Sequence, residues 1–589
     1  MTKQGCVLLV ALMLQACSAQ ITPPDYAIDD PWTRQQLDDR RWRAADELEQ
    51  DYLKLASESE LPNQQATVKV VGSTTEEAIQ SLAIKIHLIE QAQHSVDLAY
   101  YIFTPDLSGD AILGALCEAV KRGVDVRIMV DSLGSLSMEH GDLKGLIECA
   151  KNAGFVKARN GEVTINQARV QAVVFNALTQ FGSDANRRSH DKLLVVDGAY
   201  PDIAWVMTGG RNVSLHYYGL DHHGEADPNA FKDLEVLIRP LADADTKSSP
   251  AQLSEYYFSV LFSKPGNKNL SITFPYTARM QQSLDTLAEL KASAEFARAY
   301  QTIDSYLQEG FSAVVTRFAH ELDNLSSTDL VSNYSTNKKA NANSISGILA
   351  RAAYGDEDNE LTTIRVVSPY LFLQSDLLKD EGVLEKDVNT TLEWLEKDPE
   401  RKIEVITNSV LSSDNFFTQA VIDMHTVPSM LMSKEMTETW LESDLDLHEH
   451  NPEFIASAEW QALVNHPRIF FYQLGKPDAV SLGGETYYGK LHAKFIVVDE
   501  FAFVGTTNLD FRSLLYNNEV GFFFQGESLV ERLNQEFELL KSQSSRWGSS
   551  EWLEMRQKLR DQGGMKGSTT KSQRGIYKIL DKTGLKYQF

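Results

Sequence analysis

One pattern occurs twice in this sequence, about 300 residues apart, and it constrains the fold more than any other feature. The copies read SHDKLLVVDG and LHAKFIVVDE, each with a His, a Lys two residues later, an apolar run and an Asp. The residues are His190, Lys192 and Asp197 in the first copy, and His492, Lys494 and Asp499 in the second. Alternation along a β-strand places the His and the Lys on one face, while the apolar run buries the strand. The repeat therefore predicts two similar lobes.

A second strand follows each copy and ends in a turn of small residues and an Asn. The segments are WVMTGGRN, with Gly210 and Asn212, and FAFVGTTN, with Thr506 and Asn508. A Lys is a point charge for phosphate oxygens, and amide and turn N–H groups are neutral donors to the same anion. Neutral imidazole is a nucleophile and imidazolium is an acid. If the two copies meet, one His can attack a phosphorus while the other protonates the leaving oxygen, which predicts a phosphodiester substrate.

This arrangement resembles the phospholipase D superfamily, whose signature is a duplicated His-x-Lys-x4-Asp motif followed by Gly-Gly/Ser-x-Asn. The resemblance covers roughly residues 68–550, and the segments 94–132, 407–415 and 505–521 are similar to the bacterial cardiolipin synthase-like branch. It implies an α/β fold of two pseudo-twofold-related lobes, each a mixed β-sheet flanked by helices. It also implies a phospholipid phosphodiesterase or phosphatidyltransferase that acts through a phosphohistidine and uses no metal or cofactor.

The resemblance assigns a role to each matching residue. His190 would be the nucleophile, and His492 would protonate the leaving alcohol. The phosphate ligands would be Lys192, Lys494, Asn212 and Asn508, together with the turn residues Gly210 and Thr506. Each histidine would donate its second ring N–H to a carboxylate downstream of its motif, and the matching positions are Asp233 after the first copy and Glu519 after the second. We expect Asp197 and Asp499 to be structural ion-pair partners. From His to Asn the first copy is longer than the second, which predicts a longer loop at residues 199–204.

The first seventeen residues are typical of a bacterial lipoprotein signal peptide. Lys3 is followed by an apolar run at residues 7–14 and then by Cys17, which acyl chains would anchor to a lipid surface. The alternative is a short inner-membrane anchor, for which the apolar run is too short. Because Ser18 rather than Asp follows Cys17, the outer membrane is favoured. We expect a protein on the periplasmic side of the bacterial cell envelope, next to an anionic phospholipid such as phosphatidylglycerol.

The net charge of −26 argues against general nucleic-acid binding, which needs a basic surface. It does not exclude an anionic lipid, because a local cationic pocket can lie in an acidic body. Since the superfamily includes nucleases, a nuclease is the second hypothesis. A catalytically silent surface protein is the third, opposed by two complete motifs. The sequence leaves the oligomeric state open.

Patterning along the chain predicts six segments. They are the signal peptide 1–17, a tether and surface helix 18–66, a first lobe 67–263, a helical connector 264–345, a second lobe 346–550 with an insertion at about 413–460, and a basic tail 551–589. The charges of 18–66 are expected on a solvated face. The insertion suits either a lipid-facing lid or ordinary helix packing. The tail carries nine Lys or Arg from Arg556 to Lys586 against two Asp, and predicts either a contact with lipid phosphates or a solvated, partly disordered segment.

Three smaller sets of residues complete the analysis. Cys117 and Cys149 lie in helical patterns, and they are expected as buried hydrophobic side chains, although an oxidising compartment would allow them to pair. Tyrosines after the first strand of each lobe line the pocket mouth or the core; these are Tyr100, Tyr101 and Tyr370. Arginines beside the catalytic turns would bind a second phosphate; these are Arg211 and Arg512.

Overall fold

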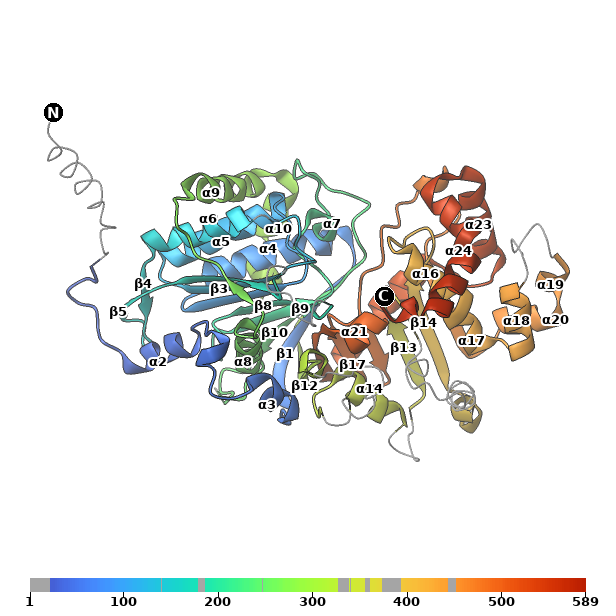
Figure 1. Ribbon diagram of the computed structural model, residues 1–589, viewed down its shortest axis with the longest axis horizontal. Coiled ribbons are helices and arrows are strands. Elements are labelled where there is room, and N and C mark those ends of the chain that lie inside the picture. The colour runs from blue at the N-terminus through green and yellow to red at the C-terminus, as the bar shows by residue number, and fades with distance from the viewer. Residues whose placement is uncertain are drawn as a thin grey trace.

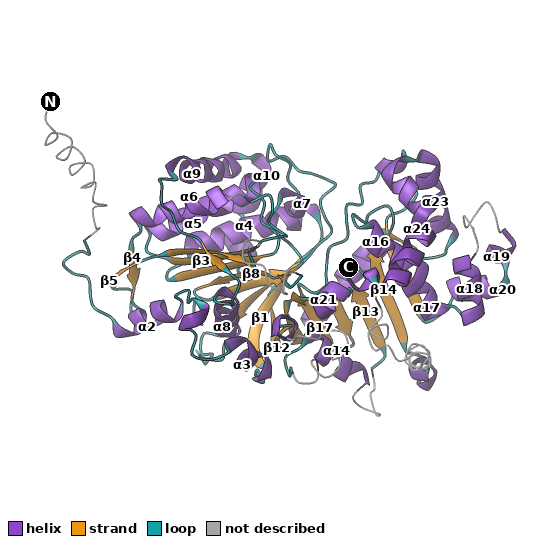
Figure 2. Cartoon of the chain, in the orientation of Figure 1, coloured by secondary structure: helices purple, strands orange, loops and turns teal. Residues whose placement is uncertain are grey.

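A computed structural model of the chain describes residues 22–138, 140–177, 186–245, 247–326, 338, 341–354, 361–372, 393–442 and 452–588. One mixed sheet of sixteen strands runs through both lobes, with helices packed against it (Figures 1 and 2). The predicted α/β class with two similar lobes is confirmed.

The order of strands in the sheet reads the same from either end, which is the structural form of the sequence repeat. The order is β11-β6-β3-β2-β8-β9-β10-β1-β12-β19-β17-β16-β13-β14-β15-β20. The strands of the first half are β1 (Gln64–Val71), β2 (Ser95–Tyr100), β3 (Asp125–Asp131), β6 (Val170–Phe175), β8 (Lys192–Val196), β9 (Trp205–Gly209), β10 (Glu235–Pro240) and β11 (Lys268–Asn269). Their counterparts are β12 (Ser312–His320), β13 (Thr363–Val367), β14 (Lys402–Asn408), β15 (Ile469–Leu474), β16 (Phe495–Val498), β17 (Phe501–Gly505), β19 (Val520–Gln525) and β20 (Ser544–Arg546).

Strand β12 lies where the sequence predicted a helix of the connector, and that prediction is wrong. It pairs antiparallel with β1 on one side and with β19 on the other. Its residues alternate between buried and partly exposed, and Val314, Val315 and Thr316 are β-branched. Two neighbouring strands with free edges and a β-branched run outweigh an apolar spacing that also fits a helix. The connector helices before this strand are α9 (Thr277–Ala292), α10 (Ala294–Gln301) and α11 (Ile303–Tyr306), and α12 (Asp323–Ser326) follows it.

Helices cover both faces of the first half of the sheet. On one face lie α4 (Thr75–Gln91), α5 (Leu107–Lys121), α6 (His140–Glu148), α9 and α10, and on the other lies α8 (Pro250–Phe262) (Figure 2). Cys117 in α5 and Cys149 after α6 are both buried, as predicted, and form a disulfide with a Cα–Cα distance of 5.5 Å. The expectation of two unpaired hydrophobic side chains is therefore corrected, because this packing brings the two thiols together.

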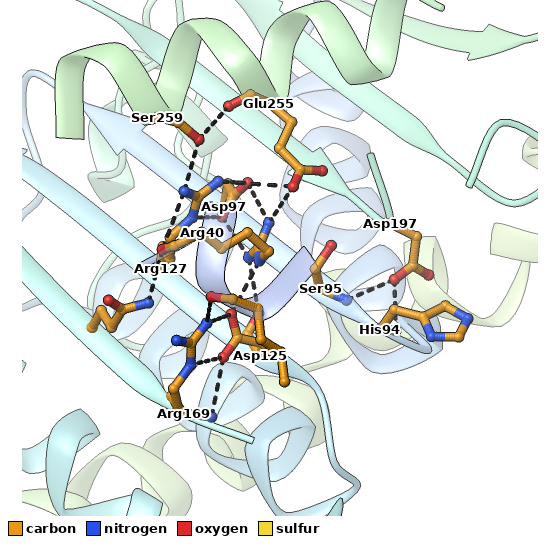
Figure 3. Close-up of polar contacts among 12 residues, drawn as sticks. Arg40, His94, Ser95, Asp97, Asp125, Arg127, Arg169, Asp197, Glu255 and Ser259 are labelled. Carbon is orange, nitrogen blue, oxygen red and sulfur yellow. Dashed lines mark hydrogen bonds and ion pairs between the residues drawn. The ribbon is translucent and has the colours of Figure 1, made fainter. Parts of the chain in front are cut away.

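The amino-terminal segment contains α2 (Pro31–Asp39) and α3 (Tyr52–Glu58), but its charges do not all face solvent. Arg40, directly after α2, is only 4% exposed and reaches into the first lobe. Its guanidinium binds Asp97 on β2, Asp125 on β3 and Glu255 on α8, at 2.8–3.0 Å (Figure 3). A buried carboxylate cluster therefore fixes this segment to the body of the molecule.

The insertion packs as ordinary helices rather than as a lid. It forms α16 (Phe416–Val421), a π-helical turn (Ile422–Thr426), α17 (Val427–Leu431), α18 (Lys434–Glu442), α19 (Pro452–Ala456) and α20 (Ala458–Val464). Met424, Met432 and Met436 are buried in the main core.

The basic tail is folded, so the alternative of a solvated, partly disordered segment is wrong. It forms α23 (Ser550–Gln562), α24 (Gly564–Thr583) and a 3-10 turn (Leu585–Gln588), and α24 packs on the second lobe against α16 and the π-helical turn (Figure 1). Arg556 binds Asp423 of the insertion at 3.0 Å. In the part of the chain that the structure describes, no helix is both long and apolar enough to span a bilayer. The predicted signal peptide and Cys17 lie outside the described residues.

Candidate active site

Each predicted catalytic histidine is held by the opposite lobe. His190 follows β7 (Arg188–Ser189), which pairs with β18 (Asn517–Asn518), and its N–H donates to the Asn518 carbonyl at 2.9 Å. The N–H of His492 donates to the Lys232 carbonyl at 2.8 Å. The side chains are 6% and 5% exposed. The repeat therefore brings the two histidine segments to the junction of the lobes, as the motif predicts.

The carboxylates beside the histidines are Asp233 and Glu519, the two predicted residues, but the expected pairing is wrong: each carboxylate contacts the histidine of the other lobe and not the one of the motif that it follows. His190 Nδ1 lies 2.9 Å from Glu519 Oε1, and His492 Nδ1 lies 2.7 Å from Asp233 Oδ2. Glu519 is itself held by the hydroxyls of Thr506 and Ser513, both at 2.6 Å. Because Nδ1 of each ring is occupied by a carboxylate, Nε2 is the nitrogen left for chemistry. We refer to these two contacts as the crossed pairs.

The two lysines of the motifs are buried beside the histidines. Lys192 and Lys494 are 0% and 1% exposed, and each Nζ donates to the carbonyl of the histidine two residues earlier, at 2.7 and 2.5 Å. Lys494 Nζ also lies 2.9 Å from His492 Nδ1. Two buried cations side by side, each near a carboxylate of either lobe, form a site for an anion.

Burial and the lysine charges keep both histidines neutral. Burial lowers the pKa of His190 well below its usual value, and the charges of Lys192 and Lys494 lower it further. Burial is also the largest cause that lowers the pKa of His492. The charges of Lys494 and Lys490, and a charge on His190, lower it further. A charge on His190 would therefore act on His492.

The partners of the histidines titrate near neutrality. Burial raises the pKa of Asp233 and of Glu519 to about 7, although nearby lysines oppose the shift. Burial lowers the pKa of Lys192 to about 8 and that of Lys494 well below its usual value. Carboxyls whose pKa values are raised to about 7, beside lysines whose pKa values are lowered, are suited to proton transfer.

The predicted amide ligands lie beside the site and have partners within the protein. Asn212 accepts from the Ile102 N–H at 3.0 Å and donates to the Tyr217 hydroxyl at 2.9 Å. Asn508 donates to Asp510 at 3.1 Å. Their role as phosphate ligands stays a prediction, since a bound phosphate would have to replace these acceptors.

The backbone N–H groups of Gly210 and Thr506 do not face a phosphate, which corrects the predicted role of the turns. They donate to Leu234 and Val520 carbonyls at 3.0 and 2.8 Å, as part of the sheet. A Cβ at Gly210 would lie 2.0 Å from an Asp233 carboxylate oxygen. Gly210 therefore lets Asp233 approach His492, and Thr506 supports Glu519 through its hydroxyl.

Asp197 and Asp499 hold strands rather than ion pairs. Asp197 accepts from the backbone N–H groups of residues 93–95 at 2.7–2.9 Å, and Asp499 accepts from those of residues 362 and 363 at 2.8 and 2.9 Å. These amides start β2 and β13. The predicted structural role agrees with this position, but the partners are backbone amides and not cations.

The two arginines of the turns differ. Arg211 is fully buried and donates to the backbone carbonyls of Val71, Gly72 and Asp233, so the prediction that it binds a second phosphate is wrong. It fixes the segment that carries Asp233, directly before β10, instead. Arg512 is half-buried, and its charge helps to lower the pKa of His190.

Aromatic rings pack against both histidines. Tyr101 meets His190 edge to face, with ring centroids 4.8 Å apart, and Tyr217 meets His492 in the same way at 5.0 Å. Tyr100 belongs to the core, whereas the Tyr370 hydroxyl donates to Asp414 at 2.8 Å. Sequence reasoning missed Tyr217, for which no repeat pattern gave a signal.

Two charged residues near the catalytic histidines were also missed. Lys490 is buried and binds Asp414 at 2.5 Å, and its charge lowers the pKa of His492. Its place two residues before His492 continues the alternation of the motif and could have identified it. Asp191 lies between His190 and Lys192 and accepts from the Tyr257 hydroxyl at 2.7 Å. Among the described side chains, no group of three or more His, Cys, Asp or Glu could hold a metal ion.

Two lobes that share one sheet, with a His–Lys strand from each meeting at their junction, define a phospholipase D-like protein. The chain matches the family model described as "Cardiolipin synthase, PLD-like domain" over residues 85–226 and 363–541, more than half of its length. It therefore belongs to this family.

Individual relatives agree with this assignment. The chain is 24% identical over 508 residues to cardiolipin synthase C of Escherichia coli K12, covering 81% of this chain and 88% of that one. It is 30% identical over 142 residues to cardiolipin synthase 1 of Bacillus cereus, about a quarter of either chain. The crystal structure of phosphatidylserine synthase from Haemophilus influenzae Rd KW20 superposes with a TM-score of 0.50 at 12% identity, covering 92% of this chain and all of the other. That likeness concerns the fold.

Proposed function

We propose that this chain is a phosphatidyltransferase of the cardiolipin synthase type, which moves a phosphatidyl group between hydroxyls through a phosphohistidine. The observation that carries the proposal is the pair of crossed His–carboxylate contacts, with two buried lysines that each bind the carbonyl of one of these histidines. Family membership and the similarity to cardiolipin synthase C support the choice of substrate class.

In the first half of the reaction, Nε2 of His190 attacks the phosphorus of a phospholipid bound between Lys192 and Lys494. The bond from phosphorus to the head-group oxygen breaks, and the imidazolium of His492 gives its proton to that oxygen. In the second half, His492 takes the proton of an acceptor hydroxyl, which attacks the phosphorus and releases His190. The lysines stabilise the charge on the non-bridging oxygens in both transition states.

The electrostatics fit this sequence of steps. In the free protein both histidines are neutral, so the nucleophile needs no activation. The negative charge of a bound diester offsets the effect of the lysines and favours protonation of His492. Asp233 then stabilises the imidazolium, at 2.7 Å from its Nδ1.

The covalent step is tested by trapping. The protein is mixed with phosphatidylglycerol that carries ³²P and denatured within milliseconds at alkaline pH, where a phosphorus–nitrogen bond survives, and the labelled peptide is then sequenced. We expect label on the peptide that contains His190 and none in the His190→Ala variant. Label on the His492 peptide would exchange the two roles. Turnover without any trapped label would contradict the covalent mechanism.

The acceptor is tested by product analysis. With phosphatidylglycerol vesicles and no other alcohol, we expect a lipid with two phosphates together with free glycerol. Phosphatidic acid as the main product would show that water is the acceptor and that the protein is a hydrolase. Cleavage of DNA offered in parallel, with the lipid untouched, would replace the proposal by a nuclease activity.

We also propose that Cys17 carries acyl chains that tether the protein on the periplasmic side of the envelope. The support is the sequence of the first seventeen residues alone. Cells that express the chain are grown with radiolabelled palmitate, and we expect label on the protein that the Cys17→Ala variant lacks. Equal labelling of both would refute the tether.

A further inference from the structure

The carboxy-terminal helix α24 has one face fixed to the protein and one basic face turned outward. Thr570, Gln573, Tyr577 and Leu580 are buried against the second lobe. Lys571, Lys578 and Lys582 are all exposed, and their spacing of seven and four residues places them within about 20° of one line along the helix. The fold therefore presents a straight row of three lysines to the surroundings, which we call the lysine row.

Large apolar side chains flank the lysine row. Met565 is 80% exposed and Ile579 is 62% exposed, and both lie on the same side of the row. Leu585, directly after the helix, is 47% exposed. Exposed apolar groups beside lysines are typical of helices that lie in a membrane interface, where the apolar groups enter the acyl region and the lysines meet phosphates.

The charge of the rest of the molecule indicates the sign of the partner. The whole chain has a net charge of −26, whereas α24 contains five Lys or Arg and a single acidic residue, Asp581. A basic surface on an acidic body orients the molecule toward an anionic surface, because the remainder is repelled.

The helix extends between the loops that carry the two halves of the active site. At its start, the Lys566 ammonium donates to the Leu411 carbonyl, in the loop that leads to Asp414 and through it to Lys490, near His492. After its end, Gln588 donates to the Tyr516 hydroxyl at 3.2 Å and accepts from Asn186 at 2.8 Å. Asn186 lies four residues before His190. The end of the chain lies beside α21 (Phe511–Leu515), where the lobes meet (Figure 1).

We propose that the exposed face of α24 docks on a bilayer surface that carries anionic phospholipids. The lysine row binds the phosphates and the side chains of Met565, Ile579 and Leu585 enter the interface. The docking itself follows from this surface alone. Its use, which is to present lipid phosphates to the site next to His190 and His492, rests on the proposed function.

The first experiment compares two variants of equal net charge. One replaces the lysine row (Lys571→Gln, Lys578→Gln, Lys582→Gln), and the control replaces three exposed or half-exposed lysines of the amino-terminal segment and the first lobe (Lys54→Gln, Lys121→Gln, Lys151→Gln). Both are made in the full chain with Cys17→Ser, which cannot be acylated at that position. Partition onto vesicles of phosphatidylglycerol and phosphatidylcholine is measured by sedimentation. Because each lysine at an anionic surface contributes about a fivefold change in binding, we expect the lysine-row variant to bind roughly 100-fold more weakly and the control to bind as the parent does.

The second experiment reads the contact directly, whatever else tethers the chain. An environment-sensitive fluorophore is attached at Ile579→Cys, or, as the matched control, at Asp285→Cys on the exposed face of α9. Vesicles that contain phosphatidylglycerol should shift the emission of the first label to the blue and leave the second unchanged. Vesicles of phosphatidylcholine alone should shift neither.

The outcomes separate docking from catalysis. A short-chain diester dissolved as monomers should be turned over equally by the lysine-row variant and the control, while only the variant loses turnover on vesicles. If the parent acts on no phospholipid, the proposed function fails and the two binding measurements still decide the docking. Equal partition of both variants, or a label at residue 579 that does not respond to phosphatidylglycerol, would overturn the docking proposal.

Discussion

At the scale of single residues, the crossed pairs are what make the two halves of the site depend on each other. His190 is oriented by Glu519 and His492 by Asp233, so neither lobe contains a complete histidine–carboxylate pair of its own. Each carboxylate is buried, which raises its pKa, and nearby lysines oppose part of that rise. The consequence is that a substitution in one lobe acts on the histidine of the other.

The Asp233→Asn variant tests this dependence. Asparagine can still accept from His492 Nδ1, but it cannot stabilise an imidazolium, so we expect kcat/KM to fall by about 10²–10⁴-fold. Imidazole NMR signals of His492 should move, while those of His190 stay. The control is Asp499→Asn, where the left-handed backbone (φ 47°) suits asparagine and the carboxylate lies outside the site, and it should keep its rate within a few-fold. Unchanged kcat/KM in Asp233→Asn would refute the role.

The pH dependence of kcat/KM should be bell-shaped. Below about pH 7, Asp233 and Glu519 become protonated and stop stabilising an imidazolium, because burial raises the pKa of each to about 7. Above about pH 8, Lys192 loses its proton, because burial lowers its pKa to about 8. The Lys192→Arg variant, whose guanidinium stays charged, should be slower but should lose the alkaline limb. An alkaline limb that persists near pH 8 in this variant would assign that limb to another group.

The residues that carry charge chemistry could be predicted from the sequence, whereas their contacts could not. The repeated spacing identified His190, Lys192 and their counterparts, because catalysis fixes both residue type and position. It could not show that Asp233 faces His492, since spacing contains no information about which lobe lies opposite. Arg211 and the turn N–H groups were misassigned for one reason: backbone carbonyls accept from these donors, which look free in a linear sequence.

At the scale of elements, the amino-terminal segment shows how a charged stretch can be part of the core. Arg40 follows α2 and lies under α8, where it joins Asp97, Asp125 and Glu255 while Arg127 and Arg169 bind the same aspartates (Figure 3). Burial alone would raise the pKa of Asp97 and Asp125, but the arginines hold both below the usual value. Composition predicted a solvated face because a buried arginine is rare, and only the acidic residues on distant strands explain this one.

Replacing Arg40 by Met should destabilise the protein by about 3–5 kcal/mol, since it leaves buried carboxylates without their partner. Unfolding by urea measures the change, and Arg34→Met on the exposed side of α2 is the control with a much smaller effect. The ion pairs of Asp97 and Asp125 contribute to the free energy of unfolding at any pH above the usual carboxyl pKa of about 4. This contribution is lost as the pH falls through the lower pKa that the two carboxyls have in the folded protein. The difference between Arg40→Met and the parent should therefore shrink only in acid. A difference that is constant from pH 7 to pH 3 would contradict this account.

At the scale of the whole molecule, β1 and β12 join the lobes into one sheet. The two strands pair with each other through backbone hydrogen bonds at the centre, and the main hydrophobic cluster contains residues of both lobes. The repeat predicted two lobes but not their union, because β12 was taken for a helix and so a central strand was missing from the prediction. A strand that depends on partners 200 residues away leaves little local signal.

Thermal unfolding should accordingly show one cooperative transition. Separating the lobes would break the β1–β12 pairing and expose the shared core, so partial unfolding is unfavourable. Differential scanning calorimetry checks this, with equal calorimetric and van't Hoff enthalpies as the expected result. Two resolved peaks, or a van't Hoff enthalpy near half the calorimetric one, would show that the lobes unfold separately.

The crossed pairs also limit how proteins of this kind can diverge. In a chimera with one half from a distant relative, each histidine would face the carboxylate of the other parent. That carboxylate is suited to a different histidine segment. Chimeras that exchange one half should thus be inactive. Chimeras that exchange a carboxylate together with the histidine segment that it contacts should keep matched partners; these are Asp233 with the segment of His492, or Glu519 with that of His190. Each histidine of this site must therefore evolve together with a carboxylate in the other half of the chain.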